Sequence, residues 1–470
     1  MSTLPRVIYL GLSLELYLKT SKPYLPIWEN AFRNWTGELK KVSDVLASRV
    51  CYTDADVEAA SADVEALKPD MVVLSAISYT PSMLIFPALQ KWKLPVVIWN
   101  TQDSPIIPDD YVPDDLTNNH TVQGIHDITN VMFQHGMQFS IVSSHWQDSV
   151  RLQKLGDELR TVKAAQAARS MKVLSLGGSF AGMGDFEFDA DELRRLWGPV
   201  NTDIGAAEFL DALATVDDAE AERIRQQDLE DFEIAPSLQK DTHIESIRRK
   251  LAIEKLLARH GATAFTMNFT ALVNYPKFGQ MPFYGINRLM AEGIGYAGEG
   301  DVLRAALMRQ LVELAGSANF TEIYTVDFKR DRFFMSHMQE CNPAMARKDR
   351  KVQLKQMPFW VQGSPDYCGM FFTLEPSEYT LVSLTHTLNG KFRFIAFPGC
   401  VPENVPFMSH YNRAYWIFQP TCGVAELLDR YSLEGGAHHL SAVAGNQMKA
   451  LKSLAKCLDF EFVDISLSMG

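Results

Sequence analysis

Short apolar runs recur through the first third of the chain, and stretches with helical character separate them. Five runs are short and apolar enough to be buried strands, at residues 7–11, 50–52, 71–76, 96–100 and 139–143. Strands that alternate with helices fold as a doubly wound parallel sheet, which binds ligands at the carboxyl ends of its strands. We therefore expect an N-terminal α/β domain over residues 1–168. No G-x-G-x-x-G follows the first run, so a dinucleotide is not indicated.

The same alternation returns further along the chain and predicts a second α/β domain over residues 169–318. An apolar run at 172–176 leads into a glycine-rich segment, which we interpret as a turn between strand and helix because no Gly-Lys-Ser/Thr follows it. Two long runs at 219–233 and 239–260 carry the Glu/Lys/Arg spacing of a solvated helix face. We expect these two helices to lie outside the chemistry.

After residue 318 the pattern changes to strand-like segments separated by Gly, Pro and Asn. These segments lie at residues 333–340, 368–374, 379–388, 391–397 and 413–418. The pair Asn389-Gly390 is a strong hairpin signal between two of them. The predicted fold class is therefore α/β, with two doubly wound parallel-sheet domains followed by a β-rich, mostly antiparallel domain over residues 319–470.

Charge and hydropathy argue against two classes of binding partner, nucleic acids and membranes. The net charge of −12 without a Lys/Arg block argues against nucleic acid and against an anionic membrane. No apolar run approaches the ~20 residues that span a bilayer, and the N-terminus lacks the apolar core of a signal peptide. Six scattered cysteines without a C-x-x-C pair indicate reduced thiols. We therefore expect a cytoplasmic protein.

A glycine-dense turn at residues 294–301 opens the helical run at 302–315. Asp301 is placed to cap this helix by accepting its free N–H groups, which leaves Glu299 free for another role. Taken alone, the segment could equally be a plain helix-start turn. Downstream lie Glu322, His337 and the pair His438-His439. Two carboxylates and two imidazoles suit Mn²⁺, Co²⁺ or Fe²⁺ better than a structural Zn²⁺, which favours cysteine.

The order Glu, Glu, His, His, with its flanking sequences, resembles the L-arabinose isomerase family of the L-arabinose/L-fucose isomerase group. The matching blocks are Arg288-Leu-Met-Ala-Glu-Gly293 leading into Gly-Glu-Gly-Asp301, then Ser336-His-Met338, and finally Gly435-Gly-Ala-His-His439. The resemblance implies a barrel-like C-terminal domain, with the metal held between the second and third domains. It also implies a homo-oligomer, a hexamer, in which N-terminal loops reach the sugar of a neighbouring subunit.

The resemblance further implies roles for single residues. Glu299 and Glu322 would both bind the metal and act as acid and base, and His337 and His439 would complete the ligand set around Mn²⁺, or Co²⁺ or Fe²⁺. His438 is expected to be a neighbour of the site, although the adjacent pair leaves open which histidine is the ligand. Candidate sugar contacts are Tyr79, His120, Gln123, Phe269, Tyr324 and Met338.

Substrate identity is less well defined than reaction type. His120 and Gln123 stand where the family shows Gln and His, and Leu14 stands where the family carries a glutamine. The leading hypothesis is a metal-dependent aldose–ketose isomerase that acts on a free pentose or hexose by enediol proton transfer. An epimerase or related metal–enediolate enzyme acting on a sugar or polyol acid is the alternative. The intact Glu, Glu, His, His set argues against a third possibility, a non-catalytic sugar-binding homologue.

Overall fold

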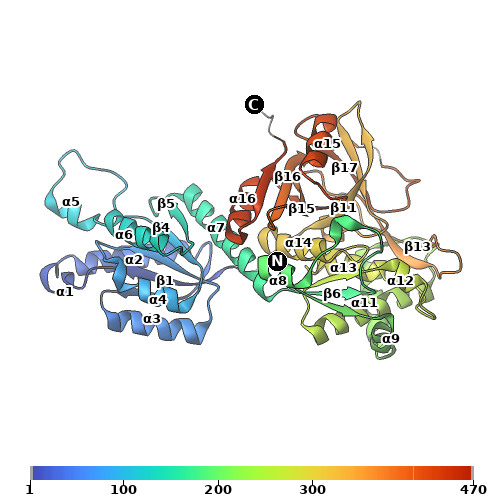
Figure 1. Cartoon of the computed structure of the whole chain (residues 1–470), viewed down its shortest axis with the longest axis horizontal. Helices are drawn as coiled ribbons and strands as arrows, with labels where there is room; N and C mark the ends of the chain where they lie inside the picture. The colour runs from blue at the N-terminus through green and yellow to red at the C-terminus, as the bar shows by residue number, and fades with distance from the viewer. Residues whose placement is uncertain (1–3, 406, 467–470) are drawn as a thin grey trace. The chain divides into compact units, whose positions relative to one another are not determined.

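A computed structural model describes residues 4–405 and 407–466. The described chain divides into two compact units, one ending at Gln166 and the other beginning at Ala167 (Figure 1). The predicted fold class is confirmed, because the units contain two parallel sheets and a C-terminal antiparallel barrel. The finer division into three domains, with boundaries after residues 168 and 318, stays a prediction. Within the described residues no helix combines the length and apolarity needed to cross a bilayer.

The first unit contains a five-stranded parallel sheet in the order β2-β1-β3-β4-β5. Its strands are β1 (Arg6–Leu12), β2 (Asp44–Cys51), β3 (Met71–Ala76), β4 (Val96–Asn100) and β5 (Ser140–Ser143). Its helices are α1 (Tyr17–Thr20), α2 (Leu25–Leu39), α3 (Asp54–Leu67), α4 (Phe86–Trp92), α5 (Pro113–Asn118), α6 (Val122–Gln134) and α7 (Ser149–Ala167). All five predicted strands are present. β2 begins six residues earlier than predicted, because an edge strand is only partly buried and its sequence is less apolar.

The second unit begins with a four-stranded parallel sheet in the order β10-β9-β6-β7. Its strands are β6 (Lys172–Leu176), β7 (Val200–Ile204), β9 (Ala264–Met267) and β10 (Gly295–Ala297). Its helices are α8 (Ala190–Leu196), α9 (Ala206–Ala214), α10 (Asp218–Asp231), α11 (Lys240–His260), α12 (Phe269–Val273), α13 (Phe283–Ala291) and α14 (Val302–Ala315). The charge-rich pattern of α11 predicted one solvated face, but not every charged residue of the helix is exposed. One side of this helix is buried, including Arg249 and Lys250, whose charges are paired with Glu245 and Glu254.

An antiparallel barrel completes the second unit. Strands β15, β18, β11, β12, β17 and β16 follow one another, and a β15–β16 pairing closes the ring. They are β11 (Asn319–Asp327), β12 (Arg332–Ser336), β15 (Glu378–His386), β16 (Phe392–Cys400), β17 (Tyr415–Pro420) and β18 (His439–Ala444), and β19 (Glu461–Asp464) adds to β16 in parallel. Helices α15 (Val424–Leu433) and α16 (Met448–Leu458) lie in the same region, and β13 (Gln353–Met357), β14 (Tyr367–Phe371) and β8 (Glu233–Ile234) form a small separate sheet.

One hydrophobic core joins the barrel to the parallel-sheet part of this unit. It combines barrel residues such as Leu381 and Trp416 with Ile247 of α11 and Tyr284 of α13. Complete burial of an apolar side chain of this size stabilises by about 1.5–3 kcal/mol, so the shared core holds the two parts together. The barrel and the parallel sheet can therefore both contribute residues to one rigid site.

Candidate metal centre

Glu299 lies in the turn between β10 and α14. Its backbone has a φ of 62°, in the left-handed region that residues other than glycine rarely adopt. Gly300 follows with a φ of 78°, and a Cβ there would come within 2.2 Å of the Gly178 carbonyl oxygen. The predicted cap is present, because the Arg304 backbone N–H donates to Asp301 Oδ1 at 3.0 Å. The tight turn thus directs Glu299 away from the helix that it precedes.

The barrel supplies the other members of the cluster from three adjacent strands. Glu322 on β11 is paired with His439 on β18 and with Ser336 on β12. His337 directly follows Ser336 in the chain. The expected strand at residues 333–340 is wrong beyond Ser336, where the chain leaves β12. The departure lets Glu340 turn back to His337.

Side chains of the cluster approach one another, in two overlapping groups of three, closely enough to hold an ion. Glu322 Oε1 lies 3.7 Å from His439 Nε2, and Glu322 Oε2 lies 4.0 Å from His337 Nε2. Glu299 Oε2 lies 4.0 Å from His439 Nε2. His438 Nε2 is also 3.9 Å from Glu299 Oε2 and 3.7 Å from Glu322 Oε1. Two atoms that each lie about 2.0–2.2 Å from one ion cannot be more than about 4.4 Å apart, and all these distances meet that limit.

Three of the donor atoms lack other partners. Glu299 Oε2, His438 Nε2 and His439 Nε2 are buried and make no hydrogen bond with any described residue. Leaving a buried polar atom unpaired costs about 1–3 kcal/mol, so three such atoms facing one another indicate a missing ligand. Two overlapping groups can hold a metal ion, Glu299 with His438 and His439, and Glu322 with His337 and His439.

Each imidazole is held by a carboxylate of its own. The Nδ1 hydrogen bonds run from His337 to Glu340 at 2.8 Å, from His439 to Asp301 at 2.9 Å and from His438 to Asp185 at 2.6 Å. Such a bond fixes the ring orientation and leaves Nε2 to face the cluster, as in metal sites where a carboxylate orients the histidine ligand.

The carboxylates set the protonation of the imidazoles. Burial would lower the pKa of His438, but the hydrogen bond to Asp185 and the nearby glutamates raise it to about 10. The pKa of His337 is also raised, because Glu340 outweighs the effect of burial. The pKa of His439 is lowered by burial, which Asp301 offsets only in part. The pKa of Glu299 is lowered despite its burial, because three imidazoles surround it.

The predicted sugar contacts fall into two groups. Tyr324 on β11 is 39% exposed, Met338 follows His337, and the ring of Phe269 packs against Phe180 and Trp360 at centroid distances of 5.7 Å. The others are Tyr79 and His120, whose rings stack at 5.3 Å, and Gln123 in the first turn of α6. This second group belongs to the first unit, whereas the Glu/His cluster belongs entirely to the second.

Sequence reasoning did not identify Glu340 or Asp185 as members of the site. Glu340 stands three residues after His337 and two residues beyond the Ser-His-Met block, so this spacing was an available signal. Asp185 lies 253 residues from His438, in the glycine-rich segment that we interpreted only as a turn. His438 itself, expected as a neighbour, directs Nε2 at both glutamates and is as close to them as His439.

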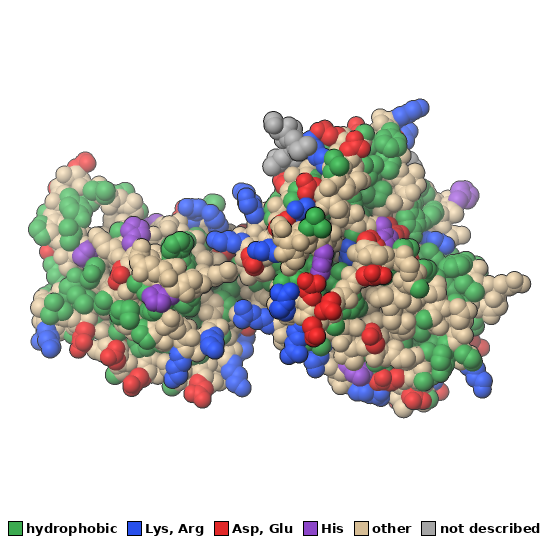
Figure 2. Space-filling view, in the orientation of Figure 1, with side chains coloured by type: hydrophobic (Ala, Val, Ile, Leu, Met, Phe, Trp, Pro, Cys, Tyr) green, Lys and Arg blue, Asp and Glu red, His purple; other side chains and the backbone are tan. Residues whose placement is uncertain are grey.

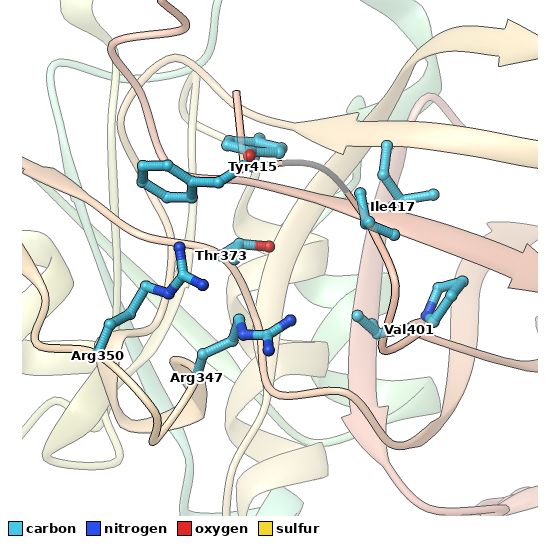
Figure 3. Close-up of a pocket in the computed structure, with 9 residues that line it drawn as sticks. Arg347, Arg350, Thr373, Val401, Tyr415 and Ile417 are labelled. Carbon is cyan, nitrogen blue, oxygen red and sulfur yellow. The ribbon is translucent and has the colours of Figure 1, made fainter. Parts of the chain in front are cut away.

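A small void elsewhere in the barrel is not a second site. Figure 3 shows Arg347 and Arg350 extending toward Thr373, with Tyr415 beside them. The void has a volume of about 10 Å³, which is room for about one water molecule. Both guanidinium groups are already engaged by Asp349. Their positive charge is therefore partly neutralised, which weakens the attraction for an added anion.

Fold and site together define a class of protein: two parallel sheets and an antiparallel barrel, with a Glu/His cluster able to hold a metal ion. Residues 194–317 match the family model of the L-arabinose isomerase central domain, and residues 317–461 match that of the L-arabinose isomerase C-terminal domain. The two models together span more than half of the chain. The chain belongs to the L-arabinose isomerase family as a divergent member.

Curated relatives agree with this assignment over most of the chain. The L-arabinose isomerase of Escherichia fergusonii is 25% identical over 406 residues, covering 83% of this chain and 79% of the relative. That of Erwinia tasmaniensis is 26% identical over 402 residues, with the same coverage, and that of Halalkalibacterium halodurans is 26% identical, covering 77% of this chain and 74% of the relative. This distant homology suggests an isomerase.

Proposed function

We propose that the protein is a metal-dependent aldose–ketose isomerase acting on a free sugar. The observation that carries this proposal is the convergence of Glu299 and Glu322 with imidazole Nε2 atoms that have no other partner. Glu299, Glu322, His337 and His439 would hold a divalent ion, for which we propose Mn²⁺, with Co²⁺ or Fe²⁺ as substitutes, because oxygen and nitrogen donors suit these ions. When bound, the ion would supply Lewis-acid polarisation of the sugar's carbonyl oxygen.

The glutamates would move the proton. Isomerisation removes the proton from C2 of the aldose and returns a proton to C1, while a hydroxyl proton passes to the former carbonyl oxygen. The lowered pKa of Glu299 keeps its carboxylate ionised near neutral pH, as a base must be. Glu322 is partly exposed and so remains accessible to a substrate. The same carboxylate that accepts the C2 proton can then donate it to C1.

The remaining predicted contacts would position the sugar. Tyr324, Met338 and Phe269 would line the site from the second unit, and an aromatic ring can pack against the apolar face of a sugar. We propose that Tyr79, His120 and Gln123 act in a neighbouring copy, within a homo-oligomer that we expect to be a hexamer. The segment around α5 supports an interface, because Ile106, Ile107, Tyr111, Val112 and Leu116 are exposed together (Figure 2).

Epimerisation is the second candidate. Glu299 and Glu322 come from different elements, a turn and a strand, and so could serve opposite faces of one carbon, as an epimerase requires. For either reaction we propose a cytoplasmic enzyme, because the six cysteines are not joined in disulfides in the part of the chain that the structure describes, which suits a reducing compartment.

A sugar screen tests the proposal. Pentoses, hexoses and deoxy sugars would be incubated with the Mn²⁺-loaded protein, and NMR would distinguish ketose from epimer. We expect a ketose product, loss of turnover after EDTA treatment, and recovery with Mn²⁺ or Co²⁺. Full activity of the metal-stripped protein would refute the metal-dependent mechanism, and an aldose epimer as the sole product would establish the second candidate.

A further inference from the structure

His337 lies just outside the hydrogen-bonded pairs of the barrel. Glu322 and His439 face each other where β11 pairs with β18, but the pairs of β12 end at Ser336. Residues 337–342 follow β12, are mostly buried, and belong to neither a helix nor a strand. A buried backbone outside regular structure takes its hydrogen-bond partners from elsewhere, so the groups that hold this segment also determine where His337 lies.

Asn287 of α13 supplies two of these partners through one side-chain amide. Its Nδ2 donates to the Gln339 carbonyl oxygen at 2.9 Å, and its Oδ1 accepts from the Cys341 backbone N–H at 3.0 Å. The amide thus takes the place that a peptide group of a neighbouring strand would have. Its two contacts lie on either side of Glu340 in the chain. Because Asn287 is completely buried, water does not compete for these bonds.

Glu340 connects this held backbone to His337. Its Oε2 binds His337 Nδ1 at 2.8 Å and accepts from the Gln339 backbone N–H at 2.9 Å, while its Oε1 accepts from the Tyr296 hydroxyl at 3.2 Å. The side chains of His337, Glu340 and Tyr296 are all buried. Since both carboxylate oxygens are engaged, a shift of the backbone at residue 340 would move the carboxylate and the imidazole that it holds.

The helix that carries Asn287 is itself fixed by a buried carboxylate. Asp228 of α10 accepts hydrogen bonds from the Tyr284 hydroxyl and the Arg288 guanidinium, and its Oδ2 lies 2.8 Å from His243 Nε2 on α11. Tyr284 lies one turn before Asn287 on α13, and Arg288 directly follows it. The amide of Asn287 is therefore carried by a helix that is tied to α10 and α11.

We propose that Asn287 is a positioning residue of the metal centre. By holding the backbone on both sides of Glu340, it sets where the His337 imidazole lies and thereby the affinity of the site for a divalent ion. The inference rests on the proposed metal-dependent function and extends it to a residue that contacts neither the ion nor the substrate. Loss of a group that orients a metal ligand typically weakens metal binding by about 10- to 100-fold.

A pair of amide substitutions in the full-length protein provides the test. Asn287→Leu keeps the size of the side chain and removes both hydrogen bonds. Gln280→Leu is the matched control, because Gln280 is 3% exposed and also uses both ends of its amide, but its partners are the carbonyl oxygens of Thr242 and Asp366 and the hydroxyl of Ser246. Electron paramagnetic resonance of free Mn²⁺ would measure the dissociation constants, and urea denaturation would measure stability.

Both variants should unfold at a lower urea concentration than the wild type, because each leaves buried backbone groups unpaired. Asn287→Leu should in addition raise the Mn²⁺ dissociation constant by about 10-fold or more and change the visible spectrum of bound Co²⁺, which reports the ligand geometry. Gln280→Leu should keep the affinity and the spectrum of the wild type.

Asn287→Asp decides the matter if Asn287→Leu does not fold. It has the shape of the wild-type side chain but sets an oxygen against the Gln339 carbonyl, so it too should weaken Mn²⁺ binding. Wild-type Mn²⁺ affinity and Co²⁺ spectrum in the folded variant overturn the proposal. Equal weakening of metal binding in Gln280→Leu also overturns it, because a general loosening of the fold would then be the cause.

Failure of this proposal and failure of the isomerase proposal are distinguishable, because metal binding is measured without turnover. Metal affinity that depends on Asn287, in a protein that converts no sugar, supports the positioning role and counts against isomerisation. Conversion of a sugar by the wild type, with wild-type metal binding in Asn287→Leu, leaves the isomerase function standing and refutes the role of Asn287. A wild type that binds neither Mn²⁺ nor Co²⁺ refutes both.

Discussion

Each histidine of the cluster is paired with its own acid, which determines how the site can take up a metal. In the metal-free protein the raised pKa of His438, about 10, keeps this imidazole protonated at neutral pH. A cation must displace that proton if His438 is to bind it, whereas His439, with its lowered pKa, offers a free lone pair. Within the adjacent pair, this difference favours His439 as the ligand and His438 as a charged neighbour of the glutamates, while His337, whose pKa is also raised, would have to lose its proton to bind the ion.

Substitutions at Glu322 and His337 should separate proton transfer from metal binding. Glu322→Gln should lower turnover by at least the ~10²–10⁴-fold of a lost general base even where metal remains bound, because an amide cannot accept the proton. His337→Asn should first weaken metal affinity, so that excess Mn²⁺ partly restores the rate. Metal content and turnover of both variants across a Mn²⁺ titration provide the measurement.

Two results would contradict this assignment. One is near-full turnover of Glu322→Gln with metal bound. The other is a label at C2 that never exchanges with solvent during turnover, which would instead favour a metal-assisted hydride shift.

Much of the candidate site could be predicted from the sequence, because Glu299, Glu322, His337 and His439 each occur in a recognisable block. The carboxylates that orient the imidazoles could not all be found in the same way. Asp301 could be assigned as a helix cap from its position, yet its second oxygen holds His439, 138 residues away. Such pairings depend on how the barrel packs on the parallel sheet, and no local pattern encodes that packing.

Helix α14 is the element that connects the two parts of the site. Its first turn carries Asp301 as the cap, and its buried Arg304 donates to the carbonyl oxygens of Asp185 and of Leu384 on β15. Asp185 in turn holds His438. The helix therefore fixes the glycine-rich segment and a barrel strand relative to Glu299, and any shift of its N-terminus should disturb the whole cluster.

The glycines at the two ends of α14 offer a matched pair of substitutions. Gly300 and Gly316 both have positive φ, 78° and 81°, but a Cβ at Gly300 meets the Gly178 backbone whereas a Cβ at Gly316 meets no atom within 4 Å. Gly316→Ala should cost about 1–2 kcal/mol of unfolding free energy from the left-handed backbone alone. Gly300→Ala should cost about 1–3 kcal/mol more, because packed backbone must move, and should also weaken Mn²⁺ binding.

Urea denaturation and metal titration of the two variants would check this expectation. Equal destabilisation, or unchanged Mn²⁺ affinity in Gly300→Ala, would show that the turn does not position Glu299.

At the level of elements, the sequence predicted strands best where both faces are buried. The runs at β3 and β4 match their predicted bounds, because every position but the last residue of β4 is buried and apolar residues predominate. The start of β2 and the end of β12 were missed for different reasons. β2 is an edge strand with intermediate burial, whereas β12 ends where a functional turn replaces a strand that would otherwise continue.

At the scale of the whole molecule, the two units carry different candidate roles, metal binding in one and contact with a neighbouring subunit in the other. All candidate metal ligands lie after Ala167, while Tyr79, His120 and Gln123 and the exposed segment around α5 lie before it. If the first unit acts on a neighbour's site, assembly should be needed for turnover but not for metal binding.

A charged substitution in the exposed segment tests this separation. Ile107 is 83% exposed, so Ile107→Asp should leave the monomer folded, yet a carboxylate buried in a subunit interface is strongly unfavourable. We expect the wild type to be a homo-oligomer by light scattering, and Ile107→Asp to dissociate, to lose turnover and to keep its Mn²⁺ content. Phe133→Asp is the control, because Phe133 is 79% exposed but lies on α6, outside the segment. A fully active Ile107→Asp monomer would show that each chain completes its own site, and the N-terminal contacts would then have to be sought within one subunit.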